Sequence, residues 1–325
     1  MMNRRENFLR FMNHEPHDHI PTLLDVCSCG NDSETFENGP LTGGLDGFGC
    51  GWVKTASAMG AGTPAPGDPV VPDVTEWRDY VKFPNIAEFD WEGLAKQQLA
   101  NYNPETQVIN YSCWNGQFLR FTHLLGFEEG LVSLITEPEA SEELLSAITD
   151  YRIETLPYIK KHFNPDFVTI LDDVATGINL FMPPATYQDL IAPQHKRWFD
   201  AVRDLGMIPS IHICGHCESI VPGLVDEGTD MWEICEPMND LPALAEQVGD
   251  KLAFFGGISM QSELALKVPT EEELNQEARN CIDKYGPCGN YGFMGMLMFE
   301  DMNEFFRAFT VMNGEAIAYG TNYYV

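Results

Sequence analysis

The chain has 325 residues, of which 44% are hydrophobic and 21% are charged, the composition of a soluble globular protein. Its 49 acidic and 19 basic residues give a formal net charge of −30, which repels phosphate backbones and anionic lipids and argues against nucleic acid or a membrane as partner. No run approaches the roughly 18 uninterrupted apolar residues of a membrane span, and the start of the chain lacks the apolar region of a signal peptide. We therefore expect a cytoplasmic protein with a small-molecule site.

Short β-rich runs alternate with longer amphipathic segments, the pattern of repeated βα units around a parallel sheet. In chain order, the predicted strands are 19–26, 51–57, 107–114, 166–173, 208–214, 230–236, 252–258 and 290–296. The predicted helices are 91–103, 137–163, 185–204, 217–227, 271–285 and 301–313. Eight strands predict a closed α/β barrel, a (β/α)8 or TIM barrel. We expect one domain over residues 1–325, with an irregular insertion around 39–73 that covers the site.

Polar and thiol side chains gather where the predicted strands end. They are Asp25, Cys27, Cys29, Cys113, Trp114, Asp172, Asp173, His212, Cys214, Glu233 and Glu236. In a βα barrel the carboxyl ends of the strands meet at one rim, where catalytic groups are found. The nine cysteines are an odd number in a chain without an export signal, so reduced thiols or metal ligands are expected rather than disulfides.

The stretch MIPSIHICGHCESIV, residues 207–221, places two histidines and two cysteines within six positions. Cys214 and Cys217 form the Cys-x-x-Cys pattern of a thiol-disulfide oxidoreductase. That interpretation needs a thioredoxin-sized domain with the motif near its start, whereas here the motif lies late in a barrel pattern. In the second interpretation, His212 and Cys214 point to the same side of a strand end and bind a metal ion, while Cys217 turns away.

The third metal ligand has two candidates. Cys288 follows Cys214 after 73 intervening residues and lies near the eighth predicted strand, which borders the same barrel mouth. Glu236, at the end of the sixth predicted strand, is a substitute or fourth ligand, because substrate can displace a carboxylate. The cysteines expected to be buried small hydrophobic residues are Cys217, Cys235 and Cys281.

Asp172 and Asp173 form a carboxylate pair at the end of a predicted strand. In one interpretation the pair is a helix N-cap plus a solvated acid, and in the other, one of the two residues orients substrate or relays a proton. We name both residues, with Glu236, as candidate catalytic residues. His195 lies in a predicted helix and is expected on the surface or in the core. Large apolar residues near the presumed mouth line either a pocket or the core: Trp52, Trp114, Phe181, Met182, Phe293, Met294 and Met296.

Several segments resemble those of the uroporphyrinogen decarboxylase superfamily, and within it those of the zinc-dependent corrinoid methyltransferases. They are RRENFLRFMNHEPHDHIPT, PPATYQDLIAPQHKRWFDAVRDLG, HICG, FFGGIS and FEDMNEFFRAF. The resemblance runs nearly end to end and implies a (β/α)8 barrel. Uroporphyrinogen decarboxylases carry an Arg-rich stretch after the first strand that grips the porphyrin acetates. This chain has LLDVCSCGND there, so porphyrin decarboxylation is not expected.

The resemblance implies a zinc ion held by His212, Cys214 and Cys288, and a partner corrinoid-binding protein. In relatives the last cysteine follows the eighth strand, whereas Cys288 precedes NYGFMGM, and the matching position falls near Met294 or Met296.

Two directions of methyl transfer stay open. In the favoured one, zinc acts as a Lewis acid on a methyl ether, such as a methoxylated aromatic compound, and the Co(I) of the corrinoid (cobalamin) accepts the methyl group. In the other, a zinc-bound thiol such as coenzyme M attacks methyl-Co(III). A barrel that only binds a ligand is a third hypothesis. The sequence leaves the methyl donor open, and also whether the protein forms a homodimer.

Overall fold

The computed structural model describes residues 2–30, 43–55, 62–67, 69–259 and 262–321. Seven strands form one parallel sheet in the order β1-β5-β6-β7-β8-β9-β10. They are β1 (Val26–Cys29), β5 (Val108–Cys113), β6 (Phe167–Leu171), β7 (Ile208–His212), β8 (Met231–Cys235), β9 (Ala253–Gly256) and β10 (Tyr291–Phe293). Phe293 of β10 pairs in parallel with Thr22, just before β1, so the sheet curls back on itself. The fold is an α/β barrel, as predicted.

The prediction that residues 51–57 form a barrel strand is wrong. Gly51–Lys54 is β3, which pairs antiparallel with β2 (Gly44–Leu45) and β4 (Gly62–Pro64) in a separate small sheet. This sheet lies in the insertion predicted around 39–73, of which 39–42, 56–61 and 68 are outside the described residues. A β-rich run predicts a strand but does not determine which strand it pairs with. The local pattern therefore could not assign residues 51–57 to one of the two sheets.

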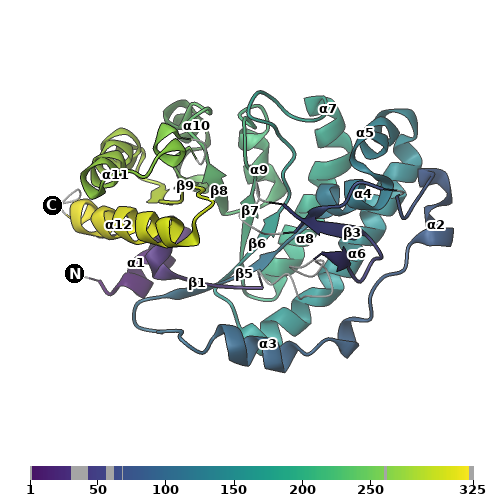
Figure 1. Cartoon of the computed structure of the whole chain (residues 1–325), viewed down its shortest axis with the longest axis horizontal. Coiled ribbons are helices and arrows are strands. Elements are labelled where there is room, and N and C mark those ends of the chain that lie inside the picture. The colour runs from purple at the N-terminus through teal and green to yellow at the C-terminus, as the bar shows by residue number, and fades with distance from the viewer. Residues whose placement is uncertain (1, 31–42, 56–61, 68, 260–261, 322–325) are drawn as a thin grey trace.

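Helices surround the parallel sheet (Figure 1). They are α1 (Arg4–Met12), α2 (Trp77–Tyr80), α3 (Trp91–Gln98), α4 (Gln117–Leu125), α5 (Phe127–Thr136), α6 (Pro138–Phe163), α7 (Pro184–Thr186), α8 (Ala192–Asp204), α9 (Val221–Glu227), α10 (Leu241–Val248), α11 (Glu271–Tyr285) and α12 (Met302–Gly320). Every predicted helix overlaps one of these, whereas α1, α2, α4, α5 and α10 were not predicted. In the described part of the chain, no helix has the length and apolar character needed to cross a bilayer.

Local signals explain where the well-predicted helices begin. At α11, the Thr270 hydroxyl accepts the Glu273 N–H while the Glu273 carboxylate accepts the Thr270 N–H, a reciprocal capping box. At α6, Pro138 occupies the first turn, where a missing N–H costs no intrahelical hydrogen bond. Such signals lie within four residues, so they can be recognised without the tertiary structure.

Helix α1 packs into the barrel interior at the amino ends of the strands. Phe167 and Phe255 point into the barrel, whereas Val168 and Phe254 point outward to the helices, as alternation along a strand requires. The Phe8 ring of α1 lies 5.9 Å from the Phe167 ring and 5.7 Å from the Phe255 ring, measured between centroids. With α1 packed at this end, functional side chains are expected at the carboxyl ends of the strands.

Asp25 is a correction to the predicted strand ends. The first strand was predicted to end there, but β1 begins at Val26, so Asp25 lies at the amino end of the barrel. Its carboxylate pairs with Arg4 of α1 and accepts the Thr22 N–H. Asp25 therefore holds α1 against the barrel and does not belong to the mouth.

Candidate functional site

Three side chains that can bind metal meet at the carboxyl ends of two neighbouring strands. His212 is the last residue of β7, Cys214 lies two residues further on, and Asp173 follows the end of β6 by two residues. Strands β6 and β7 pair in parallel with Leu171 opposite His212, so their ends lie side by side. One ligand atom each from Asp173, His212 and Cys214 lies within 4.8 Å of the other two. The structure thus brings together two predicted metal ligands and one predicted catalytic acid.

Short contacts hold these three side chains in place. The His212 Nε2 atom lies 3.2 Å from the Cys214 Sγ atom, and the Cys214 N–H donates to Oδ1 of Asp173 at 2.7 Å. On the other side of the ring, His212 Nδ1 lies 3.5 Å from Oε1 of Glu233, on β8. A carboxylate beside the second ring nitrogen is the arrangement that orients metal-binding imidazoles. It leaves Nε2 directed at Cys214 and Asp173. These two residues and His212 form a cluster that we call the metal group.

The metal group concentrates acidic side chains around one imidazole. Burial lowers the pKa of His212, but Cys214, Glu233 and Asp173 outweigh it and raise that pKa well above its ordinary value. Burial raises the pKa of the Cys214 thiol, against the opposite effect of His212. Acidic groups that are buried together need a positive partner. A divalent cation would meet this need.

The donor set fits zinc. Zinc in proteins is bound by thiolate, imidazole and carboxylate, and sites with three protein ligands keep a fourth position for water or substrate. Asp173, His212 and Cys214 supply one ligand of each type. Magnesium and calcium take oxygen ligands, so a thiolate beside an imidazole argues against them.

Gly215 forms the turn that follows Cys214. Its φ of 89° lies in the left-handed region, and a Cβ atom there would lie 2.5 Å from the carbonyl oxygen of Thr176. The Gly215 N–H donates to Oε2 of Glu236 at 2.9 Å. Glu236 therefore fixes the turn beside the metal group, and it is not a member of the group of mutually close ligand atoms found among the described residues.

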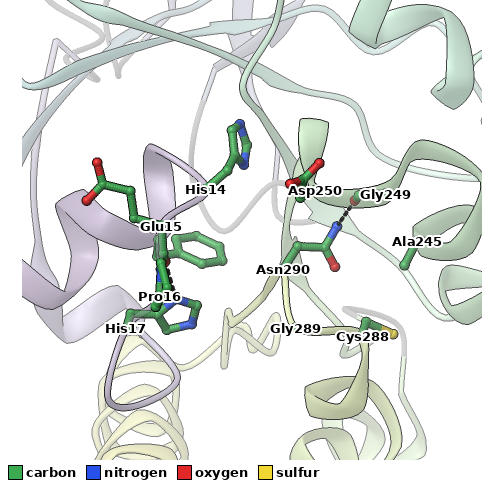
Figure 2. A pocket seen from close by; sticks show the side chains of 11 residues that line it. His14, Glu15, Pro16, His17, Ala245, Gly249, Asp250, Cys288, Gly289 and Asn290 are labelled. Atoms are coloured by element: carbon green, nitrogen blue, oxygen red, sulfur yellow. Dashed lines mark hydrogen bonds between the residues drawn. The ribbon is translucent and has the colours of Figure 1, made fainter.

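Cys288 lies in a different pocket, which Figure 2 shows together with His14 and Asn290. It comes directly before β10, whereas His212 is the last residue of β7. In a parallel barrel, residues before one strand and after another lie at opposite ends of the barrel. The structure therefore does not bring Cys288, the predicted third ligand, to His212 and Cys214, and Asp173 is the residue that lies with them.

Asp172 is fully buried behind the metal group rather than facing the cavity. Its carboxylate oxygens accept the N–H groups of Phe118 and Leu119 at 2.9 and 2.8 Å, in the first turn of α4. That helix has no capping side chain of its own, so Asp172 supplies the cap from another strand. The Asp172 side chain also lies 2.8 Å from Nε2 of His195. These contacts give Asp172, a predicted catalytic residue, a structural role in joining β6 to α4 and α8.

His195 is the centre of a buried network that the sequence did not reveal. It is fully buried, and its Nδ1 atom lies 3.2 Å from the Tyr187 hydroxyl and 3.4 Å from Oε2 of Glu227. Burial lowers the pKa of His195, but Asp172 and Glu227 outweigh it and raise the pKa to about 9. Its partners come from other elements, so spacing along the chain gives no signal of the network.

We expect this network to make stability fall in alkaline solution. Because folding raises the pKa of His195, its contribution is fully present below the ordinary value of 6.5 and is lost as pH rises through about 9. The shift corresponds to about 3 kcal/mol of unfolding free energy. Urea denaturation of the wild type and of His195→Gln at about pH 6, 8 and 10 measures how this contribution to the unfolding free energy changes with pH. Between pH 8 and pH 10 the wild type should lose more unfolding free energy than the variant does. Equal losses would contradict a raised pKa of His195 in the folded protein.

A cavity of about 650 Å³ lies at the carboxyl ends of the strands and is lined by Asp173, His212 and Glu233. Its tryptophan, phenylalanine and methionine lining residues are Trp52, Trp114, Phe167, Phe255, Met294, Met296, Met298, Phe305 and Phe309. Of the apolar residues predicted near the mouth, those outside this lining are Phe181, Met182 and Phe293. The cavity therefore joins a metal group to an aromatic and methionine-rich wall.

The small β2-β3-β4 sheet contributes Trp52 to the cavity and is anchored by Asp46. The fully buried Asp46 carboxylate accepts from Nη1 of Arg120 at 2.6 Å and from Nε1 of Trp52 at 3.0 Å. It also accepts the backbone N–H groups of Phe48 and Cys50, both at 2.9 Å. One carboxylate thus joins the insertion to α4 and sets the position of Trp52.

The structure gives no support to a Cys214–Cys217 dithiol. Cys217 is fully buried, and burial raises its pKa well above the ordinary value. A redox-active dithiol needs an accessible thiol of low pKa. The prediction that Cys217, Cys235 and Cys281 are buried is confirmed.

Comparisons with known proteins agree with the fold. A solved structure described as a methyltransferase from Methanosarcina mazei has a TM-score of 0.67 and 14% identity, and the match covers 100% of this chain and 99% of that chain. A Xaa-Pro dipeptidase with bound methionine, at 12% identity, matches 71% of this chain and 60% of that chain with a TM-score of 0.33, too low to support an argument. No curated protein matches. The family model described as uroporphyrinogen decarboxylase (URO-D) matches residues 97–294. The chain belongs to the uroporphyrinogen decarboxylase family.

Proposed function

We propose that the protein is a zinc-dependent methyltransferase that moves a methyl group from a methyl ether to the Co(I) of a partner corrinoid-binding protein. The observation that carries this proposal is the group formed by Asp173, His212 and Cys214, of which Asp173 and His212 line the cavity. The solved structure that is described as a methyltransferase has the same fold over the whole chain, which supports the choice of group transfer.

The protein's own residues have separable tasks in this proposal. Asp173, His212 and Cys214 hold the ion, and Glu233 orients His212 through its second ring nitrogen. When bound, zinc supplies a Lewis acid for the ether oxygen, on which negative charge grows as the methyl group leaves. The aromatic and methionine side chains of the cavity provide contact area for a methoxylated ring and exclude water from it.

The composition of the metal group favours an ether over a thiol as the bound group. Thiolate ligands donate more charge to a metal than carboxylates do, and so reduce its Lewis acidity. With Asp173 where a second thiolate was expected, the group contains a single sulfur ligand. Such a group suits polarisation of an oxygen. The opposite direction, transfer from methyl-Co(III) to a thiol, is the alternative that the experiment below tests.

We expect aryl methyl ethers of more acidic phenols to react faster. A better leaving group needs less stabilisation as charge develops on its oxygen. The purified protein is mixed with a Co(I) corrinoid protein and a series of ring-substituted anisoles, and the absorbance change to methyl-Co(III) gives the single-turnover rate. Cys214→Ala serves as the control, because it removes a metal ligand and should abolish the reaction.

Transfer from methyl-Co(III) to coenzyme M or homocysteine, with no reaction of any ether, would contradict the proposed direction and leave the metal centre standing. If neither reaction occurred in protein that contains zinc, the methyltransferase proposal itself would fail.

A further inference from the structure

The cavity has two unlike walls. One is polar and is formed by Ser28, Asn110 and Ser112 of β1 and β5. The other is apolar and is formed by Phe255 of β9, the segment after β10 and α12, through Met294, Met296, Met298, Phe305 and Phe309. In the sheet, β5 is the neighbour of β6, which leads to Asp173. The polar wall therefore lies next to the metal group, and a ligand bound there would meet both.

Hydrogen bonds organise the polar wall. Thr169 Oγ1 donates to Oδ1 of Asn110 at 3.1 Å, and Nδ2 of Asn110 donates to Oγ of Ser112 at 3.2 Å. Because the Ser112 oxygen accepts from Asn110, its own O–H is left to donate to a group in the cavity. Asn110 and Ser112 are 4% and 8% exposed, respectively, so a partner for that O–H has to come from a bound ligand or water.

The charged side chains of the cavity are acidic. Asp173 and Glu233 line it, and no lysine or arginine is found among the described lining residues. His123 also lines it, but burial and two nearby arginines lower its pKa to about 3, so this ring is neutral. A divalent ion bound by the Asp173 carboxylate and the Cys214 thiolate would have both of its charges balanced by them. A ligand carboxylate would then enter a cavity that is also lined by Glu233 and in which the described lining residues offer it no lysine or arginine, which is costly in a buried site.

We propose that the cavity selects uncharged methoxyarenes over carboxylated ones, with Ser112 donating a hydrogen bond to a neutral oxygen substituent of the ring. This inference rests on the proposed function and adds the charge and the orientation of the substrate. The apolar wall contacts the ring, Ser112 sets its rotation, and the ether oxygen is directed toward the metal group.

A matched pair of ligands tests the charge selection. 3-Methoxybenzamide and 3-methoxybenzoate have nearly the same shape and differ by one negative charge. Calorimetric titration of the zinc-containing protein should give an affinity for the amide at least about tenfold higher than for the benzoate. Ser28→Arg, which adds a cation to the polar wall, should raise the benzoate affinity by about tenfold and leave that of the amide within a few-fold.

A second set of variants tests the role of Ser112. Ser112→Ala should weaken amide binding by about threefold to tenfold, the effect of one hydrogen bond. Ser210→Ala is the matched control, because Ser210 is a buried strand serine two residues before His212 that is not part of the cavity lining.

Equal or tighter binding of the benzoate, or no binding of the amide, would overturn the inference. Methyl transfer is measured separately from binding, so transfer from benzoate and amide alike would overturn the charge selection while the proposed function stands.

Discussion

Cys214→Ala is expected to reduce bound zinc from about one ion per chain to a trace after dialysis. The group has three protein ligands, and removal of one leaves a site that competes poorly with water. His212→Ala should have the same effect, because it removes the imidazole that Glu233 orients. Zinc content by atomic emission gives the result directly, and a circular dichroism melt of the metal-free variants checks that the barrel remains folded.

Cys288→Ala is the matched control for this experiment. It removes a cysteine that the sequence made a ligand candidate and that the structure places in another pocket, so it should retain about one zinc per chain. Loss of zinc in Cys288→Ala, or its retention in Cys214→Ala, would contradict the metal centre described here. Asp173→Asn should weaken zinc binding by at least about 10-fold to 100-fold, whereas Glu236→Gln should have a smaller effect.

Asp46→Ala is expected to lower the free energy of unfolding by about 3 to 5 kcal/mol, because it leaves the Arg120 guanidinium buried without its carboxylate. It also removes the acceptor of the Trp52 indole N–H and of two backbone N–H groups. Since Trp52 lines the cavity, ligand affinity should fall together with stability. Urea denaturation gives the stability, and calorimetric titration with a methoxyarene gives the affinity.

Asp73→Ala is the control for Asp46→Ala. Asp73 is an exposed aspartate near the end of the insertion that accepts the Thr75 N–H as a helix cap. Its removal should lower stability far less than removal of Asp46 does, and leave the affinity unchanged. A comparable loss of stability in both variants would show that Asp46 does not anchor the small sheet in the way its contacts indicate.

The barrel and two of the three residues of the metal group could be predicted from sequence because their signals are local. Strands β5 to β10 are runs of buried residues bounded by turns, and the helices α6 and α11 begin at recognisable capping positions. His212 and Cys214 lie two residues apart, so the alternation of an extended backbone already places them on one side. Local patterns of this kind depend on few neighbours, and tertiary packing seldom changes them.

The roles of Cys288, Asp172 and Asp173 could not be predicted from sequence, because they depend on which ends of the strands and helices lie together in the folded barrel. Cys288 and Asp173 were both candidates near the mouth. Cys288 precedes its strand β10, whereas Asp173 follows its strand β6, so the two lie at opposite ends of the barrel. Asp172 and Asp173 are adjacent and chemically identical in the sequence. In an extended backbone, however, successive side chains point to opposite faces. One therefore caps α4 beside His195, and the other faces Cys214.

By itself, the sequence determined a parallel α/β barrel and the position of His212 and Cys214 together at the end of one strand. Only the tertiary structure decided that Asp173 lies beside them, that Asp46 anchors the small sheet, and that Asp172 contacts His195 inside the protein. The physical reason is that these contacts join residues from different elements. Their energies depend on distance and burial in three dimensions, which spacing along one chain does not encode.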